Sequence, residues 1–225
     1  MAKRILIING HPDPSSERFC AALAQAYAVG ARSAGHEVRS ISVGEMEVTF
    51  LASKREFEGG QPSAAIRAVQ ADFQWCEHLV IVFPLWLGAA PAKLKAFLEQ
   101  VFRQGFAFEV AGSGWKPRLG GRSARVILTM GMPATVFRLV FGAHGLLSLE
   151  RGALMLTGLA PIRHSLLGMI EGVSAARRGK WLAAMGRLGA RAKCGSAGRV
   201  LKACGAPLGY RGGSSPSEIP SCPQV

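Results

Sequence analysis

The sequence has few features that would anchor it in a membrane or cross-link it. Its longest uncharged apolar run, residues 79–92, has 14 residues and two prolines, whereas a spanning helix needs about 20 apolar residues. After Lys3 and Arg4, only residues 5–8 are apolar, which is short of the roughly 7 to 15 residues of a signal-peptide core. The five cysteines include no Cys-x-x-Cys pair, so we expect neither a disulfide framework nor a metal site. These absences predict a cytoplasmic protein.

Acidic residues are scarce relative to basic ones. The chain has 27 Lys and Arg against 14 Asp and Glu, a net charge of +13. Such a charge balance is compatible with binding to nucleic acid, to an anionic membrane surface or to phosphorylated ligands. The alternative is a basic surface that is simply solvated. We expect no nucleic-acid binding, because neither a reading helix nor an aromatic, basic sheet is evident.

What the sequence does contain is a regular alternation of two patterns. Hydrophobic residues make up 49% of the chain, as in globular proteins. Short apolar runs predict strands at residues 3–8, 38–43, 79–83, 124–129 and 162–167. Helical spacing follows each of them, at residues 16–34, 64–75, 91–102, 145–156 and 174–192. This order predicts an α/β fold with a doubly wound, five-stranded parallel sheet and helices on both faces.

Three stretches do not follow this pattern. Residues 44–63 and 105–121 show no stable period, and we interpret them as connections. In residues 194–225, 18 of 32 positions are Gly, Ser, Pro or Cys, a composition typical of disorder. We therefore predict one domain over residues 1–193, followed by a disordered tail.

Ligands of such sheets bind beyond the carboxyl ends of the strands. After the first strand, residues 10–16 lead into a helix, so backbone N–H groups and the Ser15 and Ser16 hydroxyls suit a phosphate, although a simple helix cap explains them equally well. The loop after the third strand is apolar, which suits a flat aromatic ligand or a packed dimer edge. Gly131, after the fourth strand, permits a ring to approach the backbone closely.

With these segments in place, the chain resembles the NAD(P)H dehydrogenase (quinone) family over residues 3–190. The motifs that carry the resemblance are ILIINGHP at 5–12, FPLW at 83–86, PAKLK at 91–95, EQVF at 99–102, GFAF at 105–108 and FGAHG at 141–145. The resemblance implies a flavodoxin-like fold, a tightly held flavin (FAD or FMN) and a homodimer with its active site at the subunit boundary. It also implies two-electron reduction of quinones by NAD(P)H with ping-pong kinetics.

The resemblance also assigns roles by position. The residues expected to contact the flavin phosphates are His11, Ser16, Glu17 and Arg18. The residues expected to contact the flavin ring are Pro84, Leu85, Trp86, Leu87, Thr129, Met130, Gly131 and Met132.

Two family tyrosines are missing from this chain. The family pairs the catalytic histidine, here His144, with a tyrosine, but this chain has Phe137 followed by Arg138, which could supply positive charge instead. Phe108 stands where the family often has a tyrosine in the quinone pocket. We therefore expect His144 and Arg138 in catalysis, and Phe108 and Phe137 beside the substrate.

Other interpretations remain open at this point. A flavodoxin-type electron carrier is disfavoured by the positive charge, and some relatives serve instead as regulatory flavin-binding subunits of membrane transport systems. Cys20 and Cys76 suit packing rather than nucleophilic chemistry. The last predicted helix is strongly basic, which favours either a solvated face or peripheral contact with an anionic membrane. Its basic residues are Arg177, Arg178, Lys180, Arg187, Arg191 and Lys193.

Overall fold

The computed structural model describes residues 1–111 and 114–192. Its centre is a parallel five-stranded sheet in the order β2-β1-β3-β6-β7. The strands are β1 (Arg4–Asn9), β2 (Glu37–Ser42), β3 (His78–Pro84), β6 (Ser123–Thr129) and β7 (Ile162–Leu167). This sheet confirms the predicted fold class and all five predicted strands.

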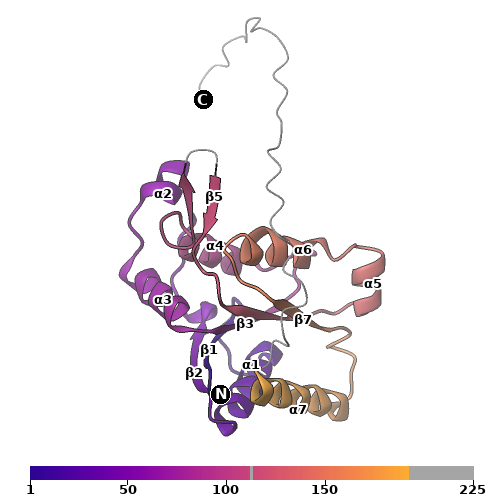
Figure 1. The fold of residues 1–225 in the computed structure, drawn as a ribbon. Coiled ribbons are helices and arrows are strands. Elements are labelled where there is room, and N and C mark those ends of the chain that lie inside the picture. The colour runs from indigo at the N-terminus through magenta and orange to yellow at the C-terminus, as the bar shows by residue number, and fades with distance from the viewer. Residues whose placement is uncertain (112–113, 193–225) are drawn as a thin grey trace, which may run out of the picture.

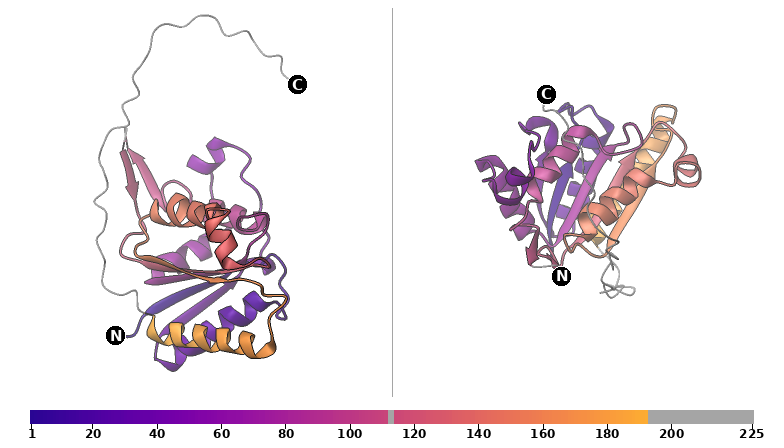
Figure 2. Two further views of the ribbon diagram at one scale, coloured as in Figure 1. Left: turned by 90° about the vertical axis from the view of Figure 1, so that its right-hand side faces the viewer. Right: turned by 90° about the horizontal axis from the view of Figure 1, so that it is seen from above.

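Helices cover both faces of the sheet (Figures 1 and 2). On one face lie α1 (Phe19–Ser33) and α7 (Ala175–Arg191), which pack against the side chains of Ile5, Val80 and Ile127. On the other face lie α3 (Ala64–Trp75), α4 (Ala92–Val101), α6 (His144–Leu147) and the π-helix η2 (Ser148–Met155). All seven residues of β3 and of β6 are buried, because helices cover these central strands on both sides.

The two segments without a sequence period contain short elements that the pattern did not predict. Residues 44–63 include the last part of η1 (Val43–Glu45) and all of α2 (Lys54–Gly59). Residues 105–121 form an antiparallel hairpin of β4 (Phe108–Ala111) and β5 (Gly114–Pro117). A further short helix, α5 (Ala134–Leu139), precedes α6. These elements have three to six residues each: the helices are too short to show a helical period, and the hairpin strands lack the continuous apolar run of the central strands.

Helix boundaries differ from the prediction in two places. The helix predicted from residue 16 begins at Phe19, because Asp13 and Ser15 form turns ahead of it. The helix predicted at 145–156 is divided into α6 and η2. Among the described residues no helix has the length and apolarity needed to cross a bilayer. The predicted tail at 194–225 lies outside the described residues and stays a prediction.

Candidate active site

The loops that follow β1, β3, β6 and β7 meet at one edge of the sheet. The backbone joins them there: Gly10 N–H donates to the Val82 carbonyl at 2.7 Å, and Leu85 N–H donates to the Thr129 carbonyl at 2.7 Å. The strand order reverses between β1 and β3. This edge is therefore the topological switch point, where open α/β sheets bind their ligands.

The loop between β1 and α1 is held by its own polar groups. Asp13 Oδ1 accepts from Ser15 N–H at 2.9 Å, and Ser15 Oγ accepts from Glu17 N–H at 3.3 Å. Neither serine caps α1: the N-cap is Arg18, with no side-chain cap, and the first turn has no acidic residue. The first N–H groups of the helix are thus free of a side-chain acceptor, as anion binding requires.

His11 lies in the same loop with a defined orientation. Its Nδ1 lies 3.1 Å from the Asp13 backbone nitrogen and 3.2 Å from the Asp13 carbonyl oxygen, so Nδ1 accepts from the first or donates to the second according to the tautomer. Partial burial lowers the pKa of His11, and a hydrogen bond donated to the Asp13 backbone only partly opposes this effect. The backbone of Asp13 thus fixes the orientation of the ring, and the lowered pKa favours its neutral form at neutral pH.

Charges beside His11 are paired. Arg18 contacts Asp13 Oδ2 through Nη2 at 2.5 Å and through Nε at 2.7 Å. The hydrogen bond from Ser15 N–H, followed by the bond from Arg18, lowers the pKa of Asp13. Ser16, Glu17 and Arg18 are exposed. Of the predicted phosphate contacts, Arg18 is thus the one already engaged by a carboxylate.

The apolar loop after β3 turns sharply beside His11. Trp86 and Ala89 exchange two backbone hydrogen bonds of 3.0 Å, and Leu87 and Gly88 between them have φ values of 47° and 78°. The Trp86 ring meets the His11 imidazole edge-on, with centroids 5.9 Å apart. Trp86 is half exposed and Leu87 is fully exposed. The loop therefore places the half-exposed ring of Trp86 at this edge of the sheet.

At the end of β6 and just after it, the backbone is more accessible to a ligand than the side chains of Thr129 and Met130. Thr129 and Met130 are buried, and the Thr129 hydroxyl lies 3.4 Å from Cys20 Sγ. Gly131 is exposed, and a Cβ there would come no closer than 4.0 Å to any atom of a neighbouring residue. Met132 is half buried. The open space at Gly131 fits the predicted close approach of a ligand ring.

His144 lies near this edge because the residue after it, Gly145, contacts the loop after β3. It is exposed at the start of α6, and the next residue, Gly145, packs directly on the loop after β3. A Cβ on Gly145 would lie 2.0 Å from the Gly88 carbonyl oxygen. Of the two α5 residues predicted beside the site, Arg138 is exposed, whereas Phe137 is 1% exposed and packs in the core.

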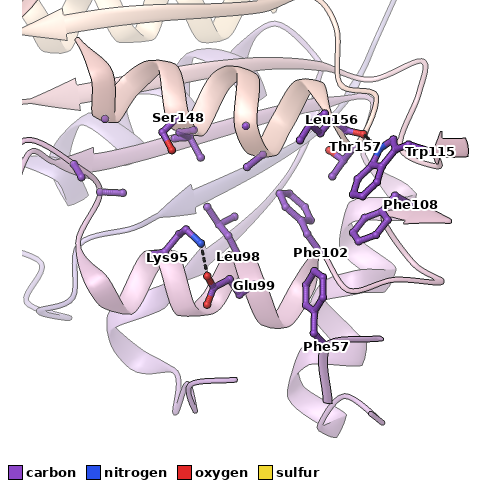
Figure 3. A pocket seen from close by; sticks show the side chains of 16 residues that line it. Phe57, Lys95, Leu98, Glu99, Phe102, Phe108, Trp115, Ser148, Leu156 and Thr157 are labelled. Atoms are coloured by element: carbon purple, nitrogen blue, oxygen red, sulfur yellow. Dashed lines mark hydrogen bonds and ion pairs between the residues drawn. The ribbon is translucent and has the colours of Figure 1, made fainter. Parts of the chain in front are cut away.

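A cavity of about 290 Å³ runs between α4 and η2 (Figure 3). Its lining includes Ala89 and Gly145, together with a group of aromatic rings. Phe108 stacks on Trp115 with centroids 3.8 Å apart, and Trp115 Nε1 donates to the Leu156 carbonyl at 2.7 Å. Phe108 is among the residues that line this cavity, whereas Phe137 is not.

Three further aromatic residues of this cavity, Phe57, Phe102 and Trp115, were not among the predicted site residues. Phe57 and Trp115 belong to stretches interpreted as connections, and Phe102 is the C-cap residue of α4. The alternation of Phe108, Val110 and Trp115 with polar neighbours could have indicated the hairpin.

Metal and thiol chemistry find no support within the described residues. They contain no group of three or more His, Cys, Asp or Glu arranged to hold a metal ion. Cys20 and Cys76 are buried, and burial raises the pKa of each thiol to about 11. Both thiols are therefore protonated at neutral pH and pack as apolar groups.

The fold is of the doubly wound α/β class, and the candidate site lies at the switch point of its sheet. A family profile described as the flavodoxin-like fold matches residues 3–187. The chain belongs to that family. A solved NAD(P)H:quinone oxidoreductase from Methanothermobacter marburgensis has the same fold, with 21% identity, a TM-score of 0.72, and coverage of 85% of this chain and 98% of that one.

Curated relatives match shorter parts of the chain. An FMN-dependent NADH:quinone oxidoreductase of Burkholderia lata is 27% identical over 147 residues, which cover 57% of this chain and 68% of that protein. Another curated relative is matched over 57% of its length. An ancillary protein, KefG, of a glutathione-regulated potassium-efflux system in Cronobacter sakazakii is 39% identical over 64 residues, which cover 28% of this chain and 33% of that protein.

Proposed function

We propose that this protein is a flavin-dependent NAD(P)H oxidoreductase of the cytoplasm that reduces quinones or similar acceptors by two electrons. In the balanced reaction, NAD(P)H gives a hydride and the solvent gives a proton, so a quinone becomes a hydroquinone and NAD(P)⁺ is released. One observation carries the proposal: an uncapped helix end, the His11 imidazole and the Trp86 ring meet at the switch point of the sheet.

The residues at this edge fit a flavin. The end of α1 supplies backbone N–H donors, and its first turn has no carboxylate, as a phosphate needs. Trp86 and the open backbone at Gly131 offer room for a flat ring. A bound flavin, FMN or FAD, supplies the hydride-accepting and hydride-donating chemistry that no amino-acid side chain has.

His144 and Arg138 complete the proposed site from the α5–α6 segment. Both side chains are exposed, and the contact of Gly145 with Gly88 holds His144 beside the loop of Trp86. Their role is to supply hydrogen-bond donors and positive charge where the reaction places negative charge.

A homodimer is part of the proposal. The apolar cavity extends from Ala89 and Gly145, at the carboxyl edge, to Phe108 and Trp115 at the hairpin. Exposed apolar residues border it: Val110, Met155 and Leu156. A second copy packed across this face would bury these side chains, and its hairpin would help to form the acceptor site at the subunit boundary. Size-exclusion chromatography with light scattering measures the expected mass of twice 23.8 kDa.

The test of the function begins with the purified protein. A yellow protein whose released ligand has the mass of FMN or FAD, and which oxidises NADH or NADPH when a soluble quinone is added, supports the proposal. Initial rates at varied quinone and NAD(P)H should give parallel reciprocal plots, as ping-pong kinetics require. A protein that remains colourless after incubation with both flavins overturns it.

A second candidate is a regulatory flavin-binding subunit of a membrane transport system, favoured by the short match to KefG. Co-purification with an integral membrane protein, together with quinone reduction too slow to sustain turnover, would favour this role over that of a free enzyme.

A further inference from the structure

Apolar side chains are exposed together at the carboxyl edge of the sheet. Three consecutive residues at the end of α5, Leu139, Val140 and Phe141, are 82%, 73% and 52% exposed. Met169 is exposed on the loop after β7, which packs on the start of α5. Exposed apolar residues close to one another mark a surface that contacts something else. We name these four residues the edge patch.

The edge patch belongs to one rigid corner of the protein. Met169 N–H donates to the Met132 carbonyl at 3.2 Å. A Cβ on Gly168 would lie 2.6 Å from the Ala134 backbone nitrogen, so the loop after β7 packs on the start of α5. In Figure 1, α5 projects from the molecule away from α2 and from the β4–β5 hairpin. The patch therefore lies on α5 and the loop after β7, away from the hairpin that borders the proposed dimer face.

Basic residues stand beside the patch. Arg138 precedes Leu139, and α7 begins at the same edge with Arg177, Arg178 and Lys180, all exposed. Arg178 Nη2 donates to the Ile170 carbonyl at 2.9 Å, which ties it to the loop of Met169. The acidic residues of this edge are Glu17, Glu171 and Asp13, of which Asp13 is paired with Arg18.

We propose that the edge patch docks this protein onto an anionic lipid surface. A bilayer of that kind supplies both an apolar layer for the exposed side chains and negative headgroups for the arginines. A second copy of the chain fits less well, because two such edges would face each other with the same excess of positive charge. Docking in this orientation would place the candidate active site beside the membrane, where lipophilic acceptors dissolve.

The test measures binding to vesicles. The full-length protein is mixed with vesicles of phosphatidylcholine alone or with about 30% phosphatidylglycerol, and the bound fraction is read by flotation. We expect binding to the anionic vesicles only, weakened by salt. The triple variant Leu139→Ser/Val140→Ser/Phe141→Ser should bind at least about fivefold more weakly, whereas Phe50→Ser, which alters an exposed aromatic residue elsewhere, should bind like the wild type.

A charge-matched pair of variants locates the contact on α7. Arg177→Gln/Lys180→Gln removes two charges at the edge, and Arg187→Gln/Arg191→Gln removes two charges about 15 Å along the same helix. The first variant should weaken vesicle binding by about fivefold for each charge removed, and the second by much less. Circular dichroism and thermal melting check that each variant is folded.

Several outcomes would overturn the proposal. Absence of vesicle binding does so directly, and equal losses in the two double variants would indicate contact along the whole basic helix instead of at the edge. A triple variant that changes the oligomeric mass but not vesicle binding would assign the patch to a second copy. Vesicle binding is measured without flavin or NAD(P)H, so its result is independent of the proposed function.

Discussion

Gly145 and Gly88 are in van der Waals contact through their backbones, and a Cβ on Gly145 would lie 2.0 Å from the Gly88 carbonyl oxygen. This contact joins the segment of His144 to the loop of Trp86. Neither glycine belongs to a sequence pattern that predicts the contact, because it depends on how α6 crosses the end of β3.

The first prediction tests this contact. Gly145→Ala must push the two loops apart, so we expect a loss of about 1–3 kcal/mol in the free energy of unfolding and weaker flavin binding. Gly152→Ala is the matched control, because a Cβ there meets nothing closer than 3.9 Å. Urea unfolding and flavin titration measure both effects. Equal behaviour of the two variants would show that the loops separate without cost.

The second prediction concerns the proposed phosphate site. Ser16→Asp places a negative charge in the turn before α1, where Ser16 is exposed. Repulsion of the phosphate should weaken flavin binding by about tenfold or more, while the fold is retained. Ser16→Asn is the neutral control. If the Asp variant purifies with full flavin content, the phosphate lies elsewhere.

The third prediction concerns His144. Removing a positioned donor typically slows a reaction by about 10- to 1000-fold. His144→Ala should therefore slow reduction of the bound flavin by NAD(P)H at least about tenfold in stopped flow, with flavin content unchanged. His164→Ala, which alters an exposed histidine of β7, is the control. Equal rates in the two variants would leave His144 as a loop residue.

The fourth prediction concerns Phe137, which stands where the resemblance implies a tyrosine. Because Phe137 is 1% exposed in the core, the hydroxyl added by Phe137→Tyr would be buried. We expect a loss of about 1–3 kcal/mol in stability and no faster flavin reduction. Thermal melting and stopped flow measure these two effects. A faster reductive step would show that the hydroxyl reaches the site.

The fifth prediction concerns a buried histidine at the opposite edge of the sheet. His78 shares hydrogen bonds with Tyr27 Oη at 3.0 Å and Ser123 Oγ at 2.8 Å. Burial, followed by the charge of Arg125, lowers the pKa of His78 to about 3. Below pH 6.5 the unfolded chain therefore takes up a proton that the folded protein does not, so stability falls as the pH decreases toward 3.

The size of this effect follows from linkage. The loss should approach about 1 kcal/mol per pH unit, measured by urea unfolding between pH 7.5 and 5. His78→Gln should flatten this dependence, whatever its effect on stability at pH 7.5. A dependence as steep in His78→Gln as in the wild type would assign the proton to another group.

Much of the fold could be predicted because its signals are local. Central strands covered on both faces need continuous apolar runs, and β3 and β6 have them. The helix predicted at 64–75 coincides with α3, which begins at the side-chain cap of Ser63. The start of α1 was missed because Asp13 and Ser15 turn the backbone before it, and such turns resemble a cap in sequence.

The candidate site, too, could be predicted only in part from the sequence. The amino-acid sequence by itself determined the alternating α/β order and thereby the edge at which His11, Trp86 and Gly131 gather, since strand ends in a parallel sheet share one side. Only the tertiary structure decided that Phe137 is buried, that Phe108 stacks on Trp115, and that the edge patch is exposed. These outcomes depend on contacts between segments far apart in the chain, and the period of a single segment carries no information about which partner it meets.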